Sequence, residues 1–234
     1  MATNSKTESK YKLVKPTELL PLTRHFSYPL TQFLLKIPIS PNQVTALSLF
    51  IGLIGAICFS LGNSSAGIVG GLLLIASYTL DNCDGEIARI KNLSSDWGAQ
   101  FDDIADWLVD SVFFTSLGYG VFTATNEKLW LWLGLAATAG ATLDYIIDLV
   151  FHFNAKRDLD TKSREQIAKQ VRKPVDTIDW IIYIFHKLSR ADFCIIVFGL
   201  ALFDSTWILL PLGAVGAQFY WITDLFQRSR GWHT

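Results

Sequence analysis

The chain has 234 residues, of which 50% are hydrophobic and 13% aromatic, and its formal net charge is −1. This length suits one domain, and no nucleic-acid partner is expected. The three cysteines, Cys58, Cys83 and Cys194, are odd in number and lack metal-ligand spacing, which excludes a disulfide framework and a zinc site.

The first 39 residues are expected to precede the membrane-spanning part of the chain. Residues 1–15 form a polar tail without the apolar core of a secretory signal. In 16–39, apolar residues such as Leu19 and Phe26 recur at largely helical intervals, with polar residues between them. We predict an amphipathic helix on the cytoplasmic membrane interface, broken or kinked near Pro29. A helix packed on the protein's own cytoplasmic loops is an equally good interpretation.

Six apolar runs follow, each close to the length of roughly 20 residues that a helix needs to cross a bilayer. We place them at 44–63, 66–88, 99–122, 129–153, 188–204 and 206–226. They make up a transmembrane catalytic domain at 40–228, followed by a tail at 229–234. The predicted fold class is an all-α integral membrane protein, with six transmembrane helices preceded by an N-terminal amphipathic interfacial helix.

Basic residues are concentrated in alternate connections between these runs. Six of them precede the first run, and others lie between the second and third, between the fourth and fifth, and after the last. The three opposite connections contain one basic residue between them, Lys128. Because cytoplasmic loops carry the excess of Lys and Arg, we expect both termini and the connection between the second and third runs to face the cytoplasm.

Acidic residues occur at the end of the second run and the start of the third, where carboxylates at hydrocarbon depth are costly and mark functional sites. Asp81 and Asp84 fall within one arc of a helix, and Asp102 and Asp106 share a face of the next one. Four such carboxylates would repel one another and would not all ionise without a compensating cation. Their oxygen ligands point to one or two hard divalent ions, such as Mg²⁺, Mn²⁺ or Ca²⁺.

Small residues and an arginine accompany these carboxylates. Gly85 and Ala88 share the face of Asp81 and leave space for a flat ligand or a close helix contact. Arg89 suits a diphosphate. Carboxylates, a hard metal, small residues and an arginine together describe a site for a phosphoanhydride substrate.

The same residues carry a family resemblance. The run Asp81-x2-Asp84-Gly85-x2-Ala88-Arg89-x8-Gly98-x3-Asp102-x3-Asp106 resembles the signature of the CDP-alcohol phosphotransferases, also called phosphatidyltransferases, at all eight fixed positions over 26 residues. An interfacial helix followed by Pro41-Asn42-x2-Thr45 at the first of six spans also resembles that family. The resemblance implies a CDP-linked donor, transfer of its substituted phosphate to an alcohol acceptor, release of CMP, and a homodimer in the lipid bilayer.

The resemblance also implies a role for each matching residue. Asp81, Asp84 and Asp102 would ligate Mg²⁺ or Mn²⁺, with two ions in the site. Asp106 would be the general base that takes the acceptor's hydroxyl proton, and would also touch the second metal. The CDP-binding residues would be Gly85, Ala88, Arg89, Gly98, Asn42 and Thr45. For Asn42 and Thr45, capping the start of the first helix is an equally good interpretation.

A second polar segment, Lys187-Leu188-Ser189-Arg190-Ala191-Asp192, precedes the fifth apolar run. Arg190 and Asp192 resemble an Arg/Asp pair at this place in relatives that use inositol phosphate. The predicted acceptor-binding residues are Arg190, Lys187, Lys156 and Arg157, whose charges suit a phosphorylated acceptor. For Lys156 and Arg157, charges of the positive-inside pattern are the preferred interpretation. Of the remaining acidic residues, Glu86 and Asp96 are expected to be solvated, Asp103 and Asp110 to support the site, and Asp144 and Asp148 to form ion pairs inside the bundle.

These features predict an enzyme with its active site open to the cytoplasm. The leading reaction is transfer of a phosphatidyl-type group from a CDP-lipid, such as CDP-diacylglycerol, to a phosphorylated alcohol such as inositol phosphate or glycerol phosphate. The roles could also be reversed, with a CDP-linked headgroup and a lipid alcohol. An ion or phosphate transporter is the alternative from another class, but the small residues and the arginine suit a nucleotide, and no inverted repeat is apparent.

Overall fold

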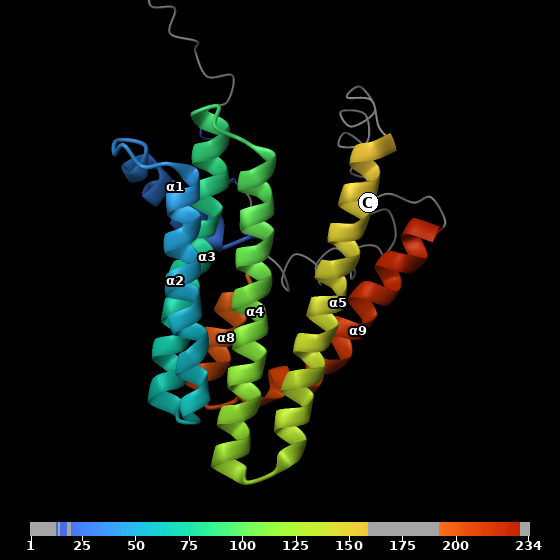
Figure 1. Ribbon diagram of the computed structural model, residues 1–234. Helices are drawn as coiled ribbons and strands as arrows, with labels where there is room; N and C mark the ends of the chain where they lie inside the picture. Colours follow the sequence, from blue (N-terminus) through green and yellow to red (C-terminus); the bar gives the residue numbers. More distant parts are fainter. Residues whose placement is uncertain (1–12, 14, 18–19, 159–191, 230–234) are drawn as a thin grey trace, which may run out of the picture.

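The computed structural model describes residues 13, 15–17, 20–158 and 192–229, and this part of the chain is all helical, with no strand (Figure 1). The elements are α1 (Thr23–Leu34), α2 (Pro41–Cys58), η1 (Phe59–Leu61), α3 (Ser64–Ile90), α4 (Asp96–Thr125), α5 (Lys128–Asp158), α8 (Phe193–Leu202), η2 (Thr206–Ile208) and α9 (Leu209–Ser229). The prediction of an all-α protein is confirmed for these residues.

Three of the described helical segments are long and apolar enough to cross a membrane: Pro41–Leu61, Ser64–Ile90 and Lys128–Val150. The segments Phe193–Leu202 and Thr206–Phe219 are shorter apolar helices. These are the helices of an integral membrane protein, and the count of six spans stays a prediction. The fifth span was expected at 188–204, but the described helix starts at Phe193, and 188–191 lie outside the described residues.

Polar caps, and not changes in hydropathy, set where the helices begin. The Ser40 hydroxyl accepts from the backbone N–H of Gln43, and the Gln43 side chain accepts from the N–H of Ser40, which makes a capping box at the start of α2. The side chains of Asn63 and Ser95 accept from the backbone N–H groups of Ala66 and Gly98 and cap α3 and α4. The helices therefore extend beyond the apolar runs at both α3 and α4. Because Ser40 is the cap of α2, the interpretation of Asn42 and Thr45 as caps is wrong.

Helix α2 packs against both α3 and α4, α8 packs against α3, and α5 packs against both α4 and α9 (Figure 1). The largest group of buried apolar side chains centres on Phe113, which contacts Phe59 and Phe193 edge to face. Glycines allow the close approach of α4 to α5, because a Cβ on Gly118 would lie 3.0 Å from the Cα of Gly134. This packing fixes the relative register of the helices that carry the acidic residues.

Helix α1 packs on the end of α3, at the end of the bundle where α4 begins (Figure 1). It is continuous through Pro29, so the helix is not broken there, and the alternative of a kink stays a prediction. Its buried face carries hydroxyls, those of Thr23, Ser27 and Thr31, whereas Phe26 and Phe33 are 53% and 59% exposed. The inner face combines these hydroxyls, which meet carboxylates, with the buried side chain of Leu34. The outward apolar residues agree with the predicted interfacial location, which stays a prediction.

Candidate active site

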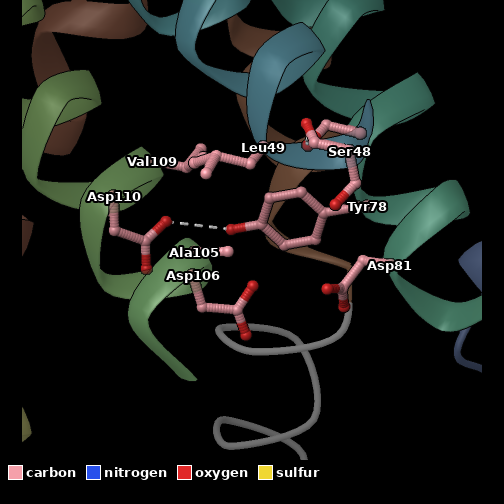
Figure 2. Close-up of a pocket in the computed structure, with 9 residues that line it drawn as sticks. Ser48, Leu49, Tyr78, Asp81, Ala105, Asp106, Val109 and Asp110 are labelled. Carbon is pink, nitrogen blue, oxygen red and sulfur yellow. Dashed lines mark hydrogen bonds between the residues drawn. The ribbon is translucent and has the colours of Figure 1, made fainter. Parts of the chain in front are cut away.

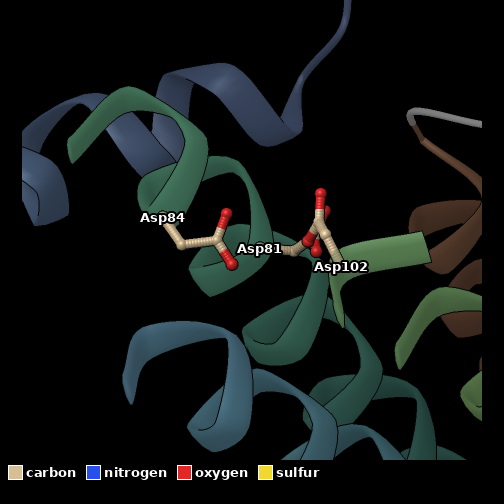
Figure 3. A group of neighbouring side chains, drawn as sticks. All are labelled: Asp81, Asp84 and Asp102. Carbon is tan, nitrogen blue, oxygen red and sulfur yellow. The ribbon is translucent and has the colours of Figure 1, made fainter. Parts of the chain in front are cut away.

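Three carboxylates converge between α3 and α4. The short connection between Ile90 and Asp96 brings the last turns of α3 beside the first turns of α4. Oxygens of Asp81, Asp84 and Asp102 all lie within 4.8 Å of one another (Figure 3). Oxygens that ligate one Mg²⁺ lie at most roughly 4 Å apart. Small side-chain rotations would therefore bring this group to the spacing of a metal site.

Asp84 is held in place from the neighbouring helix. It is 4% exposed, and the hydroxyl of Thr45 on α2 donates to its Oδ2. The same hydroxyl lies 3.2 Å from the carbonyl of Pro41. Thr45 was expected at the nucleotide, and its observed contact is to the acidic group. Fixing one carboxylate oxygen in this way restricts the rotation of Asp84 and leaves its second oxygen available.

The surroundings of Asp102 show whether the three carboxylates fit a cation. Its Oδ1 atom is buried and has no hydrogen-bond partner. Among the described residues, the only other buried side-chain oxygen or nitrogen without a partner is the Oγ of Ser111. A buried acceptor without a partner is costly, and more so when it belongs to an ionised group. A divalent cation between the three carboxylates would give that oxygen a partner and would offset their mutual repulsion.

The fourth carboxylate of the signature lies beside this group. Asp106 is exposed, and together with Asp81 it lines a small pocket that extends into the bundle between α2, α3 and α4 (Figure 2). Tyr78 and Asp110 also line this pocket, and the Tyr78 hydroxyl donates to Asp110 Oδ1 at 3.1 Å. Asp106 can therefore meet a ligand that enters from outside, next to the three converging carboxylates.

Tyr78 is a site residue that the sequence analysis missed. It lies three positions before Asp81 and hence on the same face of α3. The available signal was its hydroxyl, one helical turn before Asp81 in a largely apolar stretch. Asp110, expected to support the site, lines the pocket, whereas Asp103 is exposed on α4.

The predicted nucleotide residues form two pairs around the acidic group. A Cβ on Gly85 would lie 3.5 Å from Nη1 of Arg89, so the exposed guanidinium folds back over this glycine. A Cβ on Gly98 would lie 3.1 Å from Oδ1 of Asn42, so α2 and the start of α4 adjoin there. Ala88 is half-buried on α3. The missing side chains at the two glycines thus let Arg89 and Asn42 lie close to the backbone of α3 and α4.

The predicted acceptor residues are placed only in part. Lys156 and Arg157 belong to the last turn of α5, where the structure describes the backbone but not the side chains. Lys187 and Arg190 lie outside the described residues. Asp144 is half-buried and Asp148 is exposed on α5. These acceptor assignments stay predictions.

Two further expectations concern single acidic residues. Asp96 is exposed in the first turn of α4, as expected. Glu86 was expected to be solvated, and this is wrong. It accepts hydrogen bonds from Thr31 Oγ1 at 2.6 Å and from Ser27 Oγ at 3.3 Å, because α1 packs across this side of α3.

Comparison with known proteins identifies the family. Residues 38–217 match the family model described as CDP-alcohol phosphatidyltransferase, and the chain belongs to this family. The resemblance noted in the sequence is thereby confirmed.

Individual relatives agree with this assignment. The chain is 32% identical over 122 residues to the bifunctional IPC transferase and DIPP synthase of Thermococcus kodakarensis, and 38% identical over 110 residues to that of Rubrobacter xylanophilus. These alignments cover 52% and 47% of this chain but only 26% and 24% of the relatives. The chain thus aligns with about a quarter of each of these curated proteins.

The fold is similar to a solved structure. The crystal structure of Mycobacterium tuberculosis phosphatidylinositol phosphate synthase with CDP-DAG bound has a TM-score of 0.56 to this chain, at 17% identity, and the match covers 87% of this chain and 92% of that one. At this identity the similarity concerns the fold.

Proposed function

We propose that the chain is a membrane enzyme that transfers a phosphatidyl-type group from a CDP-linked lipid to a phosphorylated alcohol and releases CMP. The observation that carries this proposal is the convergence of Asp81, Asp84 and Asp102, with Asp106 beside them, on the signature positions of the family. The description of the family as phosphatidyltransferases, and the CDP-DAG bound in the solved structure of similar fold, support a CDP-lipid as the donor.

In this proposal Asp81, Asp84 and Asp102 hold Mg²⁺ or Mn²⁺, with two ions in the site. Bound there, such ions would neutralise the charge of the donor diphosphate and of the departing CMP. The guanidinium of Arg89 contacts the donor phosphates. Gly85 and Ala88 leave room for the cytidine, with Asn42, Thr45 and Gly98 on its other side.

Asp106 is assigned as the general base. It is more exposed than Asp84 and lies next to the three converging carboxylates, where an acceptor hydroxyl can reach it. As the acceptor oxygen attacks the phosphorus that bears the lipid, Asp106 takes the hydroxyl proton, and the bond from that phosphorus to the bridging oxygen of CMP breaks. CMP then leaves, and the lipid phosphate remains esterified to the acceptor.

The proposal extends to the membrane arrangement. Six spans would place both termini and the site on the cytoplasmic side, and the protein would be a homodimer. Arg89, in the last turn of α3, and Lys91, just after the helix, lie near the acidic group, which supports a cytoplasmic location for this end of the bundle.

The reaction can be tested directly. The purified protein is incubated with CDP-diacylglycerol, Mg²⁺ and a panel of alcohols, and the products are identified by mass spectrometry. We expect CMP and a phosphatidyl product that retains the acceptor's phosphate. If a product instead forms only when a CDP-linked headgroup and diacylglycerol are supplied, the donor and acceptor roles are reversed. No CMP release with any pair would overturn the proposed function.

The role of Arg190 gives a prediction for the acceptor. Arg190→Ala should raise the KM for a phosphorylated acceptor by an amount equivalent to about 1.5–3 kcal/mol, the value of a hydrogen bond to a charged group. CDP binding should change far less. Steady-state kinetics with glycerol phosphate or inositol phosphate measures both, and an unchanged KM and kcat would remove Arg190 from the acceptor site.

The contact from Thr45 to Asp84 gives a prediction for the metal. Thr45→Val keeps the shape of the side chain and removes its hydroxyl, so Asp84 loses a partner that orients it. Metal affinity should fall about 10- to 100-fold, as is typical when such supporting groups are lost. Titration of activity with Mg²⁺ measures the change, and Thr125→Val, at the opposite end of the bundle, is the control. Equal effects of the two variants would contradict the prediction.

A further inference from the structure

Helix α1 is capped by a residue from a distant part of the chain. Its own N-cap residue, Leu22, makes no capping hydrogen bond through its side chain. Instead, Asp192, just before α8, accepts from the backbone N–H of Leu22 at 2.9 Å and from that of Thr23 at 3.0 Å, and also from the Thr23 hydroxyl at 3.2 Å. Asp192 is 2% exposed. Both of its oxygens therefore serve the helix terminus, where a carboxylate also complements the helix dipole.

The middle of α1 is held by α3. Glu86 accepts from the hydroxyls of Ser27 and Thr31, two residues on the buried face of α1. Glu86 follows Asp84 by two positions, which turns it by roughly 200° around the helix. The end of α3 therefore presents metal-ligand candidates on one side and α1 on the other.

The chain that follows α1 is also tied to α3. The Lys91 ammonium donates to the carbonyls of Ile39 at 2.9 Å and Ile37 at 3.4 Å. Hydrogen bonds that involve an ionised group are the stronger ones. The buried face of α1 carries three hydroxyls and the side chain of Leu34, which belongs to an apolar cluster with Leu80 and Ile87 of α3. Polar contacts thus act together with apolar burial to place α1.

We propose that Glu86 and Asp192 are positioning residues: acting through α1, they hold the start of α8 in register with the metal-bearing end of α3. This inference rests on the proposed function. Asp192 follows Arg190 by two positions in the sequence, so loosening Asp192 frees the backbone next to the proposed acceptor residue. The carboxylates that would bind metal and CDP lie on α3 and α4 and do not depend on this link.

The donor and acceptor chemistry of the two contacts predicts different outcomes for similar substitutions. The hydroxyls that meet Glu86 can both donate and accept, so the amide in Glu86→Gln keeps partners for both of them. The backbone N–H groups that meet Asp192 only donate. In Asp192→Asn the side-chain nitrogen cannot accept from them, and one N–H at the start of α1 loses its partner.

The test compares Glu86→Gln, Glu86→Leu and Asp192→Asn with the unaltered chain, and Asp204→Asn at the far end of the bundle is the control. Steady-state kinetics use CDP-diacylglycerol with glycerol phosphate or inositol phosphate, and titration calorimetry measures CDP binding in Mg²⁺. Hydrogen exchange of residues 22–34 reports the docking of α1. Should Glu86→Leu fail to fold, Thr31→Val replaces it.

We expect Asp192→Asn and Glu86→Leu each to raise the acceptor KM at least tenfold and to speed exchange in α1, with CDP affinity within threefold of the unaltered chain. Glu86→Gln and Asp204→Asn should stay within twofold in every measurement. In the variant that combines Glu86→Leu with Asp192→Asn, the rise in acceptor KM should be smaller than the product of the two single rises, because both substitutions act through α1. An unchanged KM in Asp192→Asn, or a loss of CDP affinity as large as the rise in KM, would overturn the positioning role. An unaltered chain without turnover would instead contradict the proposed function.

Discussion

Replacing Asp102 by asparagine should abolish metal-dependent turnover, with a loss of about a thousandfold or more, because metal ions supply several kcal/mol of charge stabilisation in such reactions. The variant should still fold and insert into the membrane. Its side chain would no longer place a third negative charge beside Asp81 and Asp84, so the metal-free protein should be at least as stable as the unaltered one.

Thermal unfolding with and without Mg²⁺ separates these effects. A cation that binds only the folded state stabilises it by about 2.7 kcal/mol at a concentration of 100 times its Kd. The unaltered chain should show a rise in Tm with Mg²⁺, and Asp102→Asn should show none. Asp96→Asn, at an exposed position in the first turn of α4, is the matched control and should behave as the unaltered chain does. Near-full activity of Asp102→Asn in Mg²⁺ would show that Asp102 does not ligate the metal.

Asp106→Asn is the second variant with a large expected effect, and its pattern should differ. A general base contributes typically 10²–10⁴-fold, so turnover should fall by about that factor. CDP binding in Mg²⁺ should remain within about threefold, because Asp81, Asp84 and Asp102 are unaltered in this variant. Calorimetric titration with CDP and measurement of CMP release give the two quantities. If CDP binding and turnover fall together, Asp106 is a metal ligand and not the base.

The acidic group could be predicted from the sequence because its geometry is local. Spacings of three and four residues put Asp81 and Asp84 on one part of α3, and Asp102 and Asp106 on one part of α4. A short connection then makes these two helices neighbours, so periodicity and loop length together bring the carboxylates to one place. The structure adds the hydrogen bonds from Thr45 to Asp84 and from Tyr78 to Asp110, which periodicity alone does not reveal.

The placement of α1 could not be predicted in the same way. Its contacts to Asp192 join residues 169 and 170 positions apart, and no local pattern encodes such a separation. The alternation of apolar and polar residues indicated an amphipathic helix correctly, but not which face would be buried. Two features of the buried face settle this: its hydroxyls meet the carboxylates of Glu86 and Asp192, and Leu34 packs into an apolar cluster with α3. The contacts of Glu86 with Ser27 and Thr31 are also distant in the sequence, so the residues around Glu86 did not predict them.

The central claim is that the carboxylates of α3 and α4 hold a divalent ion that is needed to bind a cytidine diphosphate group. The most direct measurement is calorimetric titration of the purified protein with CDP, in Mg²⁺ and again after the ion has been removed with a chelator. The account predicts saturable binding of CDP in Mg²⁺, no measurable binding without it, and restoration when Mg²⁺ or Mn²⁺ is added back. Binding of CDP that is equally tight without a divalent ion, or no binding under either condition, would contradict it.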